Sequence, residues 1–176
     1  MSDHVSAETR QTVGSRANFV CEYCLIAEAD AYFRFQVEHI ISRKHGGSSQ
    51  LDNLAFACVF CNRYKGSDIA SLIPETIELV RFYNPRTDRW REHFHLKGVV
   101  IASLTEIGEA TARILQMNHD DQVLEREVLS RWALSKRSGV VVDNGTLNAH
   151  RVGQGRALEL AWRPRGNSLA RSGRRH

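Results

Sequence analysis

The 176-residue chain has no long hydrophobic run. A helix that spans a membrane needs about 20 consecutive apolar residues, whereas the best run, Gly98 to Ala102, has the length of a strand. The first twenty residues carry Asp3, Glu8, Arg10 and Arg16 and lack the apolar centre of a secretory signal. We therefore expect a cytoplasmic protein without a membrane partner, in a reducing compartment where disulfides are rare.

The chain also has no uniform excess of one charge, although its sequence pI is about 9.1. Residues 1–135 hold 15 basic and 18 acidic side chains, a net charge of −3, whereas residues 136–176 hold 9 and 2, a net charge of +7. A nucleic-acid partner must therefore be argued from local chemistry in the first hundred residues, not from the pI.

Hydrophobic spacing in the first part of the chain predicts a mixed order of helices and strands. Helix-like spacing behind a Ser6 cap predicts a first helix over 6–20. The segment 33–41 is rich in β-branched and aromatic residues and predicts a strand, followed by a glycine-rich loop. A short apolar strand at 54–57 then leads into a helix within 58–70. The order is strand, loop, strand, helix.

The second part of the chain predicts a small strand-and-helix extension over 71–135 that packs on a first module over 1–70. Segments 90–96 and 99–103 read as a hairpin, and Thr105 can cap a helix that runs to about 117. Asp120 can cap another helix to about 134, with one apolar face. That face contains Val123, Leu124, Val128, Leu129 and Trp132. Residues 136–176 have the composition of a weakly ordered basic tail.

The four cysteines form two Cys-x-x-Cys pairs, Cys21/Cys24 and Cys58/Cys61. Two such pairs can supply four thiolates to one tetrahedral zinc ion. Two disulfides or four buried free thiols are the alternatives, but a reducing compartment and matched pairs favour zinc. Because the protein would fill every coordination position, we predict a structural zinc that clamps the two pairs together. The 33 residues between the pairs then begin and end at the same place.

The residues between and beside the cysteine pairs carry a family resemblance. The pattern resembles the HNH endonuclease family in its zinc-clamped form and covers about residues 15–68. Its motifs are Val37-Glu38-His39-Ile40, Gly46-Gly47, Asp52-Asn53-Leu54 and Cys58-x-x-Cys61-Asn62-x-x-Lys65-Gly66. The resemblance implies a ββα-metal fold within an α+β protein. It also implies metal-dependent cleavage of DNA phosphodiester bonds.

The resemblance assigns a role to each of four residues. His39 corresponds to the general base, and an imidazole with an ordinary pKa of about 6.5 suits that task at neutral pH. Glu38 and Asn62 correspond to the protein ligands of one catalytic ion, either magnesium or manganese, whose other ligands are water and phosphate. Asn53 corresponds to the residue that holds the histidine-bearing strand and its loop in register.

Two of these positions depart from the commonest family pattern. Glu38 stands where many relatives have aspartate, and Asn62 stands where others have a final histidine, which makes this an H-N-N variant. An asparagine ligand favours hard, oxygen-seeking ions.

Several positive side chains near these motifs can contact DNA. Arg43, Lys44 and His45 lie on the predicted loop, and Arg63 and Lys65 lie on the predicted helix. Contacts of this kind go to the phosphate backbone and carry no base specificity. Ordinary solvated surface charges are the alternative.

Three functional classes remain open from the sequence. The first is a DNA endonuclease, in which a homodimer would be one way to cut both strands. The second is a zinc-dependent nucleic-acid-binding module without catalysis, which would have no need for Glu38, His39, Asn53 and Asn62 together. The third is a protein-interaction module dominated by residues 82–135. His93 and His95, which alternate on a predicted strand, could bind metal, although a solvated strand face is the simpler interpretation.

Overall fold

The computed structural model describes residues 5–138 of the chain. The predicted basic tail lies almost wholly outside these residues. Within the described part, no helix combines the length and the apolar character needed to cross a membrane.

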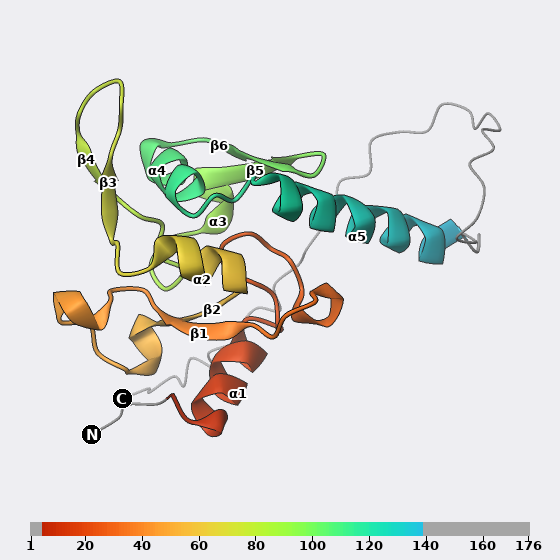
Figure 1. The fold of residues 1–176 in the computed structure, drawn as a ribbon, viewed down its shortest axis with the longest axis horizontal. Helices are drawn as coiled ribbons and strands as arrows, with labels where there is room; N and C mark the ends of the chain where they lie inside the picture. Colours follow the sequence, from red (N-terminus) through yellow and green to blue (C-terminus); the bar gives the residue numbers. More distant parts are fainter. Residues whose placement is uncertain (1–4, 139–176) are drawn as a thin grey trace, which may run out of the picture. The chain divides into compact units, whose positions relative to one another are not determined.

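The predicted strand, loop, strand and helix are present in that order (Figure 1). Strand β1 (Gln36–His39) pairs antiparallel with β2 (Leu54–Ala57), and the register places Glu38 opposite Ala55. Helix α2 (Val59–Lys65) follows β2 directly, with Cys58 as its N-cap. Two short 3-10 turns, η2 (Arg43–His45) and η3 (Leu51–Asn53), shape the loop between the strands. The expected strand over 33–41 is thus confined to four residues.

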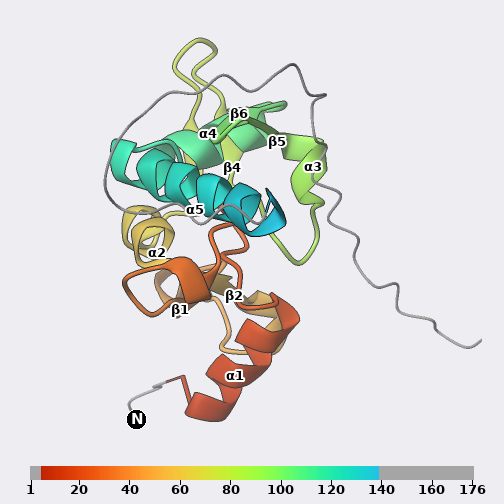
Figure 2. The same ribbon diagram turned by 90° about the vertical axis from the view of Figure 1, so that its right-hand side faces the viewer.

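Helix α1 (Ala7–Arg16) packs against the hairpin from the side opposite α2 (Figures 1 and 2). The hydroxyl of Ser6 accepts a hydrogen bond from the backbone N–H of Thr9, which confirms the predicted cap. The helix ends four residues earlier than expected. Asn18 and Phe19 both adopt positive φ, at 52° and 55°, so the chain leaves the right-handed helix before it reaches the first cysteine pair.

The extension contains two further hairpins and three helices. One hairpin, which the sequence did not predict, pairs β3 (Ala70–Leu72) with β4 (Leu79–Arg81). The other pairs β5 (Phe94–Lys97) with β6 (Val100–Ser103), as predicted. However, residues Trp90–His93 form a short helix, α3, instead of the start of a strand.

Helices α4 (Glu106–Ile114) and α5 (Asp120–Ser138) complete the described chain. Thr105 caps α4 by accepting a hydrogen bond from the N–H of Gly108. The expected apolar face of α5 is wrong. Only part of it is buried: Leu129 packs against the core, whereas Leu124 and Val128 are more than half exposed and Gln122 and Arg126 are buried. The side chain of Trp132 lies outside the described residues.

The buried face of α5 is polar because its side chains satisfy backbone carbonyl groups. Arg126 donates to the carbonyls of Val99, at 2.6 Å, and Met117, at 2.7 Å. The amide of Gln122 donates to the carbonyl of Gln116. The helix therefore closes over the preceding turn and hairpin by hydrogen bonds as well as by apolar contact.

Direct contacts join the extension to the first cysteine pair. Arg86 forms an ion pair with Glu22, and both side chains are largely buried. The indole N–H of Trp90 donates to the carbonyl of Tyr23 at 2.8 Å. The rings of Tyr23 and Tyr83 meet edge to face at 6.3 Å. One buried hydrophobic cluster runs from Val13 on α1 to Met117 beyond α4.

Candidate active site and metal clamp

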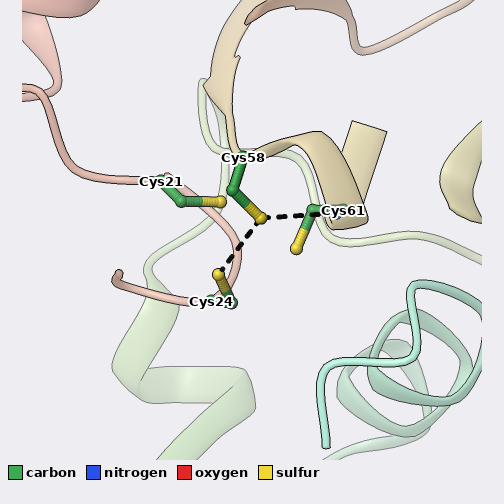
Figure 3. A group of neighbouring side chains, drawn as sticks. All are labelled: Cys21, Cys24, Cys58 and Cys61. Carbon is green, nitrogen blue, oxygen red and sulfur yellow. Dashed lines mark hydrogen bonds between the residues drawn. The ribbon is translucent and has the colours of Figure 1, made fainter. Parts of the chain in front are cut away.

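The four cysteines converge at one buried point (Figure 3). Their sulfur atoms all lie within 4.8 Å of one another. Cys21 and Cys24 come from the loop after α1, and Cys58 and Cys61 come from the first turn of α2. This arrangement brings together all four of the predicted ligands.

The geometry fits a zinc ion. Zn–S bonds of about 2.3 Å in a tetrahedron place sulfur atoms about 3.8 Å apart, and the Cys24 and Cys58 sulfurs are 3.6 Å apart. The thiols of the cluster also differ in the direction of their pKa shifts. Burial opposes ionisation of Cys21, but hydrogen bonds from the other three thiols outweigh it and lower its pKa well below the usual range. Hydrogen bonds within the cluster raise the pKa values of Cys24 and Cys61. Zinc binding must therefore release protons.

A polar pocket of about 290 Å³ opens beside the end of β1. It brings together His39 of β1, the η2 loop and Asn62 of α2. His39 is half-buried, and its Nε2 lies 3.0 Å from the hydroxyl oxygen of Ser49. The pocket is lined by Val37, Glu38, His39, Ser42, Arg43, Lys44, Asn62, Gly66 and Ser67.

Asn53 cross-links the loop that lies between the two strands. Its Oδ1 accepts from the N–H of Ile41 at 2.9 Å, and its Nδ2 donates to the carbonyls of Ile41 and Ser48, both at 2.8 Å. The loop closes tightly here, because a Cβ atom on Gly47 would lie 1.7 Å from the Ile41 carbonyl oxygen. These bonds are the ones that a residue holding the strand end and loop in register would make.

Asn62 is half-buried on α2 and shares the pocket with His39. Its Nδ2 donates a short hydrogen bond to the side-chain oxygen of Gln36, on β1. That bond uses Nδ2, and Oδ1 is the atom of the amide with the chemistry to bind a hard cation. The position and chemistry of Asn62 fit the predicted ligand role.

Glu38 lines the pocket but is buried. Its side chain is 3% exposed and points into the core. Oε1 accepts from Lys65 Nζ at 2.5 Å, and Oε2 accepts from the Tyr23 hydroxyl at 2.8 Å. Burial raises the pKa of Glu38, and both hydrogen-bond donors oppose that shift. Both oxygens thus accept hydrogen bonds within a buried cluster, and the role of Glu38 as an ion ligand stays a prediction.

Lys65 is buried, which differs from its predicted place on the surface. The sequence placed it among the DNA contacts, but its side chain is 1% exposed and cannot reach a phosphate. Besides Glu38, its ammonium donates to the carbonyl of His39 at 3.1 Å. Arg43, Lys44, His45 and Arg63 are exposed, as a DNA-contacting role requires.

The two histidines of the extension do not form a pair on one strand. His93 lies in α3, and its Nδ1 is 2.7 Å from the hydroxyl of Thr105. His95 is exposed on β5. Neither belongs to a cluster of metal-ligating side chains in residues 5–130, where the four cysteines are the one such group.

Sequence reasoning missed Tyr23 and Ser49. Tyr23 lies between Cys21 and Cys24, but nothing in a single sequence shows that its hydroxyl reaches Glu38. Ser49 belongs to a Gly-Gly-Ser-Ser loop that resembles an ordinary flexible linker. In both cases the contact depends on how the loop folds back.

Comparison with known proteins agrees with this geometry over the central part of the chain. Residues 21–68 match the family model described as HNH endonuclease. No curated protein and no solved structure matched the chain. The matched segment begins at the first zinc-clamp cysteine and ends just after α2, so it contains both the clamp and the pocket. Residues 21–68 therefore form an HNH endonuclease family domain, and such a domain implies a phosphodiester hydrolase that acts on nucleic acid.

Proposed function

We propose that the protein is a metal-dependent DNA endonuclease whose general base is His39. The observation that carries this proposal is the meeting of His39 and Asn62 in one open pocket, within a segment that matches the HNH family. The clamp holds the start of α2, which carries Asn62. The Asn53 cross-link holds the chain just after β1, which carries His39.

The residues of the pocket suit hydrolysis of a phosphodiester. His39 would take a proton from a water molecule as the water oxygen bonds to phosphorus and the bond to the leaving sugar oxygen breaks. Ser49 fixes one nitrogen of the imidazole. Asn53 would orient the strand end that carries the base.

Asn62 would hold the divalent ion, either magnesium or manganese, together with water and the phosphate of the DNA. Such an ion, when bound, stabilises negative charge at the phosphate and at the leaving oxygen. Arg43, Lys44 and Arg63 would contact the DNA backbone. One pocket serves one strand, so a double-strand break would need a homodimer or two separate events.

Plasmid nicking tests this proposal. Zinc-loaded protein with added magnesium or manganese should convert supercoiled plasmid to nicked circles, and His39→Ala with equal zinc content should lose about 10² to 10⁴ of the rate. Lys97→Ala, on the exposed turn of the β5–β6 hairpin, is the matched control and should nick at the normal rate. A wild-type protein that binds DNA but never cuts it would instead support the zinc-dependent binding module.

A further inference from the structure

A buried polar cluster adjoins the pocket, and one of its residues, Glu38, also lines the pocket. It consists of Tyr23, Glu38 and Lys65, whose side chains are all 3% exposed or less. The Tyr23 hydroxyl and the Lys65 ammonium each donate to a different oxygen of the Glu38 carboxylate.

The cluster ties together the three segments that build the nuclease module. Tyr23 lies between the clamp ligands Cys21 and Cys24, Glu38 lies on β1, and Lys65 is the last residue of α2. The Lys65 ammonium is bound to Glu38 and also, at 3.1 Å, to the backbone carbonyl of His39. The Lys65 ammonium therefore binds both the side chain of Glu38 and the backbone of His39, the proposed base.

Strand geometry explains why these contacts matter for His39. Successive side chains on a strand point to opposite faces, so Glu38, which is buried, and the half-buried His39 leave β1 on opposite faces, although both residues line the pocket. Fixing the Glu38 carboxylate and the His39 carbonyl together leaves the strand little freedom to rotate about its axis. The imidazole is then presented in one direction.

We propose that Glu38 is a positioning residue, whose carboxylate, held by Tyr23 and Lys65, sets the place of His39 and does not bind the catalytic ion. The inference rests on the proposed nuclease function, which it refines. Two physical arguments support it. A divalent cation at Oε1 would be repelled by the ammonium 2.5 Å away. Releasing Glu38 to bind an ion would leave the buried Lys65 charge unpaired, which is strongly destabilising.

Two residues of the extension also contact Tyr23 of this cluster. Trp90 donates to the Tyr23 carbonyl, and the Tyr83 ring packs edge to face on the Tyr23 ring. The position of the Tyr23 hydroxyl is therefore set from outside the HNH segment. On this view, Tyr83 and Trp90 help to orient the catalytic base through Tyr23 and Glu38.

The dependence of nicking on manganese concentration separates a positioning role from a ligand role. Glu38→Gln and Lys65→Met should each lower the saturated rate by about 10- to 100-fold, as expected for a misplaced base. The manganese concentration that gives half of the maximal rate should stay within about twofold of the wild-type value. The double variant should be no slower than the slower single variant, because the two residues act as one unit.

Asn62→Ala is the matched comparison, because Asn62 fits the ligand role. It should raise the half-saturating manganese concentration by at least tenfold. If Glu38→Gln does the same while Lys65→Met leaves that concentration and the rate unchanged, Glu38 is an ion ligand and the proposal is overturned. Tyr23→Phe, which removes one hydroxyl from a packed ring, provides a milder variant where Lys65→Met fails to fold.

A measurement without DNA or catalytic ion keeps the two proposals separate. In zinc-loaded full-length protein with ¹³C-labelled histidine, Glu38→Gln and Tyr23→Phe should shift the His39 ring resonances, which are assigned from His39→Ala. His95, exposed on β5, serves as the internal reference and should not move. Unchanged His39 resonances in both variants would overturn the positioning role. A wild-type protein that fails to nick DNA would instead count against the nuclease function, whatever the spectra show.

Discussion

The four-cysteine clamp and the pocket are built from neighbouring residues, yet their polar groups differ in exposure to solvent. The four clamp cysteines are at most 3% exposed and face one another. His39 and Asn62 are half-buried and form hydrogen bonds with the exposed side chains of Ser49 and Gln36. The clamp cysteines are enclosed, whereas His39 and Asn62 of the pocket keep access to solvent. Glu38, buried between Tyr23 and Lys65, resembles the clamp cysteines in its exposure, although it also lines the pocket.

The strongest test of this comparison removes the clamp. Zinc binding in finger peptides is worth about 10–16 kcal/mol, which is as large as the whole stability of a typical domain, about 5–15 kcal/mol. Chelation, or Cys58→Ser, should therefore unfold the HNH segment. Circular dichroism should report lost structure, and Trp90 fluorescence should change because its indole is bonded to Tyr23, between two ligands. An unchanged spectrum after complete zinc removal would show that the clamp is not structural.

Asn53 shares a feature with each region. It is buried like the clamp cysteines, but its hydrogen bonds shape the loop of the pocket. Asn53→Asp keeps the size of the side chain, but it replaces the amide donor with an oxygen that faces the carbonyls of Ile41 and Ser48. We expect a loss of about 1–3 kcal/mol in the free energy of unfolding and at least a tenfold loss in nicking rate. Urea unfolding and plasmid nicking measure the two effects. A stable variant with full activity would show that the loop does not need this cross-link.

Asp88 provides a structural carboxylate of the extension for comparison with the polar groups of the pocket. It accepts hydrogen bonds from Arg81, at 2.6 and 3.0 Å, and from the N–H of Asn84 at 2.8 Å. Burial opposes its ionisation, but these bonds outweigh burial and lower its pKa. Asp88→Asn should therefore cost about 1–2 kcal/mol at neutral pH without changing the nicking rate.

The sign of the pH dependence follows from the lowered pKa of Asp88. The stabilisation is fully present above the unfolded-state pKa of about 3.9 and is lost as the pH falls through the lower folded-state pKa. The difference in unfolding free energy between wild type and Asp88→Asn should thus be constant from pH 8 to 5 and shrink below about pH 4. Zinc loss in acid is common to both proteins and cancels in that difference. A difference that grows in acid would contradict the assignment.

Lys44 should show the smallest effect, because it is exposed at the rim of the pocket. A phosphate contact contributes about 0.9 to the slope of log binding constant against log salt concentration. Lys44→Ala should reduce the slope by about that amount and weaken binding equally for unrelated DNA sequences. Lys97→Ala should leave the slope unchanged. Equal slopes for wild type and Lys44→Ala would place the DNA elsewhere.

The sequence was most informative where chemistry and spacing coincide. Both cysteine pairs, the β1–β2 order and the start of α2 were predicted because metal ligands and strand residues have strict spacing. The ion pair between Glu38 and Lys65 was not predicted, because the two residues are 27 positions apart and only the folded chain shows that they are buried together. The face of α5 was mispredicted for a related reason. Arg126 is buried by bonds to two backbone carbonyls, which hydrophobic periodicity does not register.

The central claim, that His39 is the general base of a nuclease, is tested most directly by chemical rescue. His39→Gly should lose nicking activity and leave space for a free imidazole molecule. Added imidazole should then restore part of the rate in this variant and leave wild type unaffected, with zinc content and Lys97→Ala as controls. A His39→Gly protein that nicks DNA as fast as wild type, without imidazole, would contradict the account.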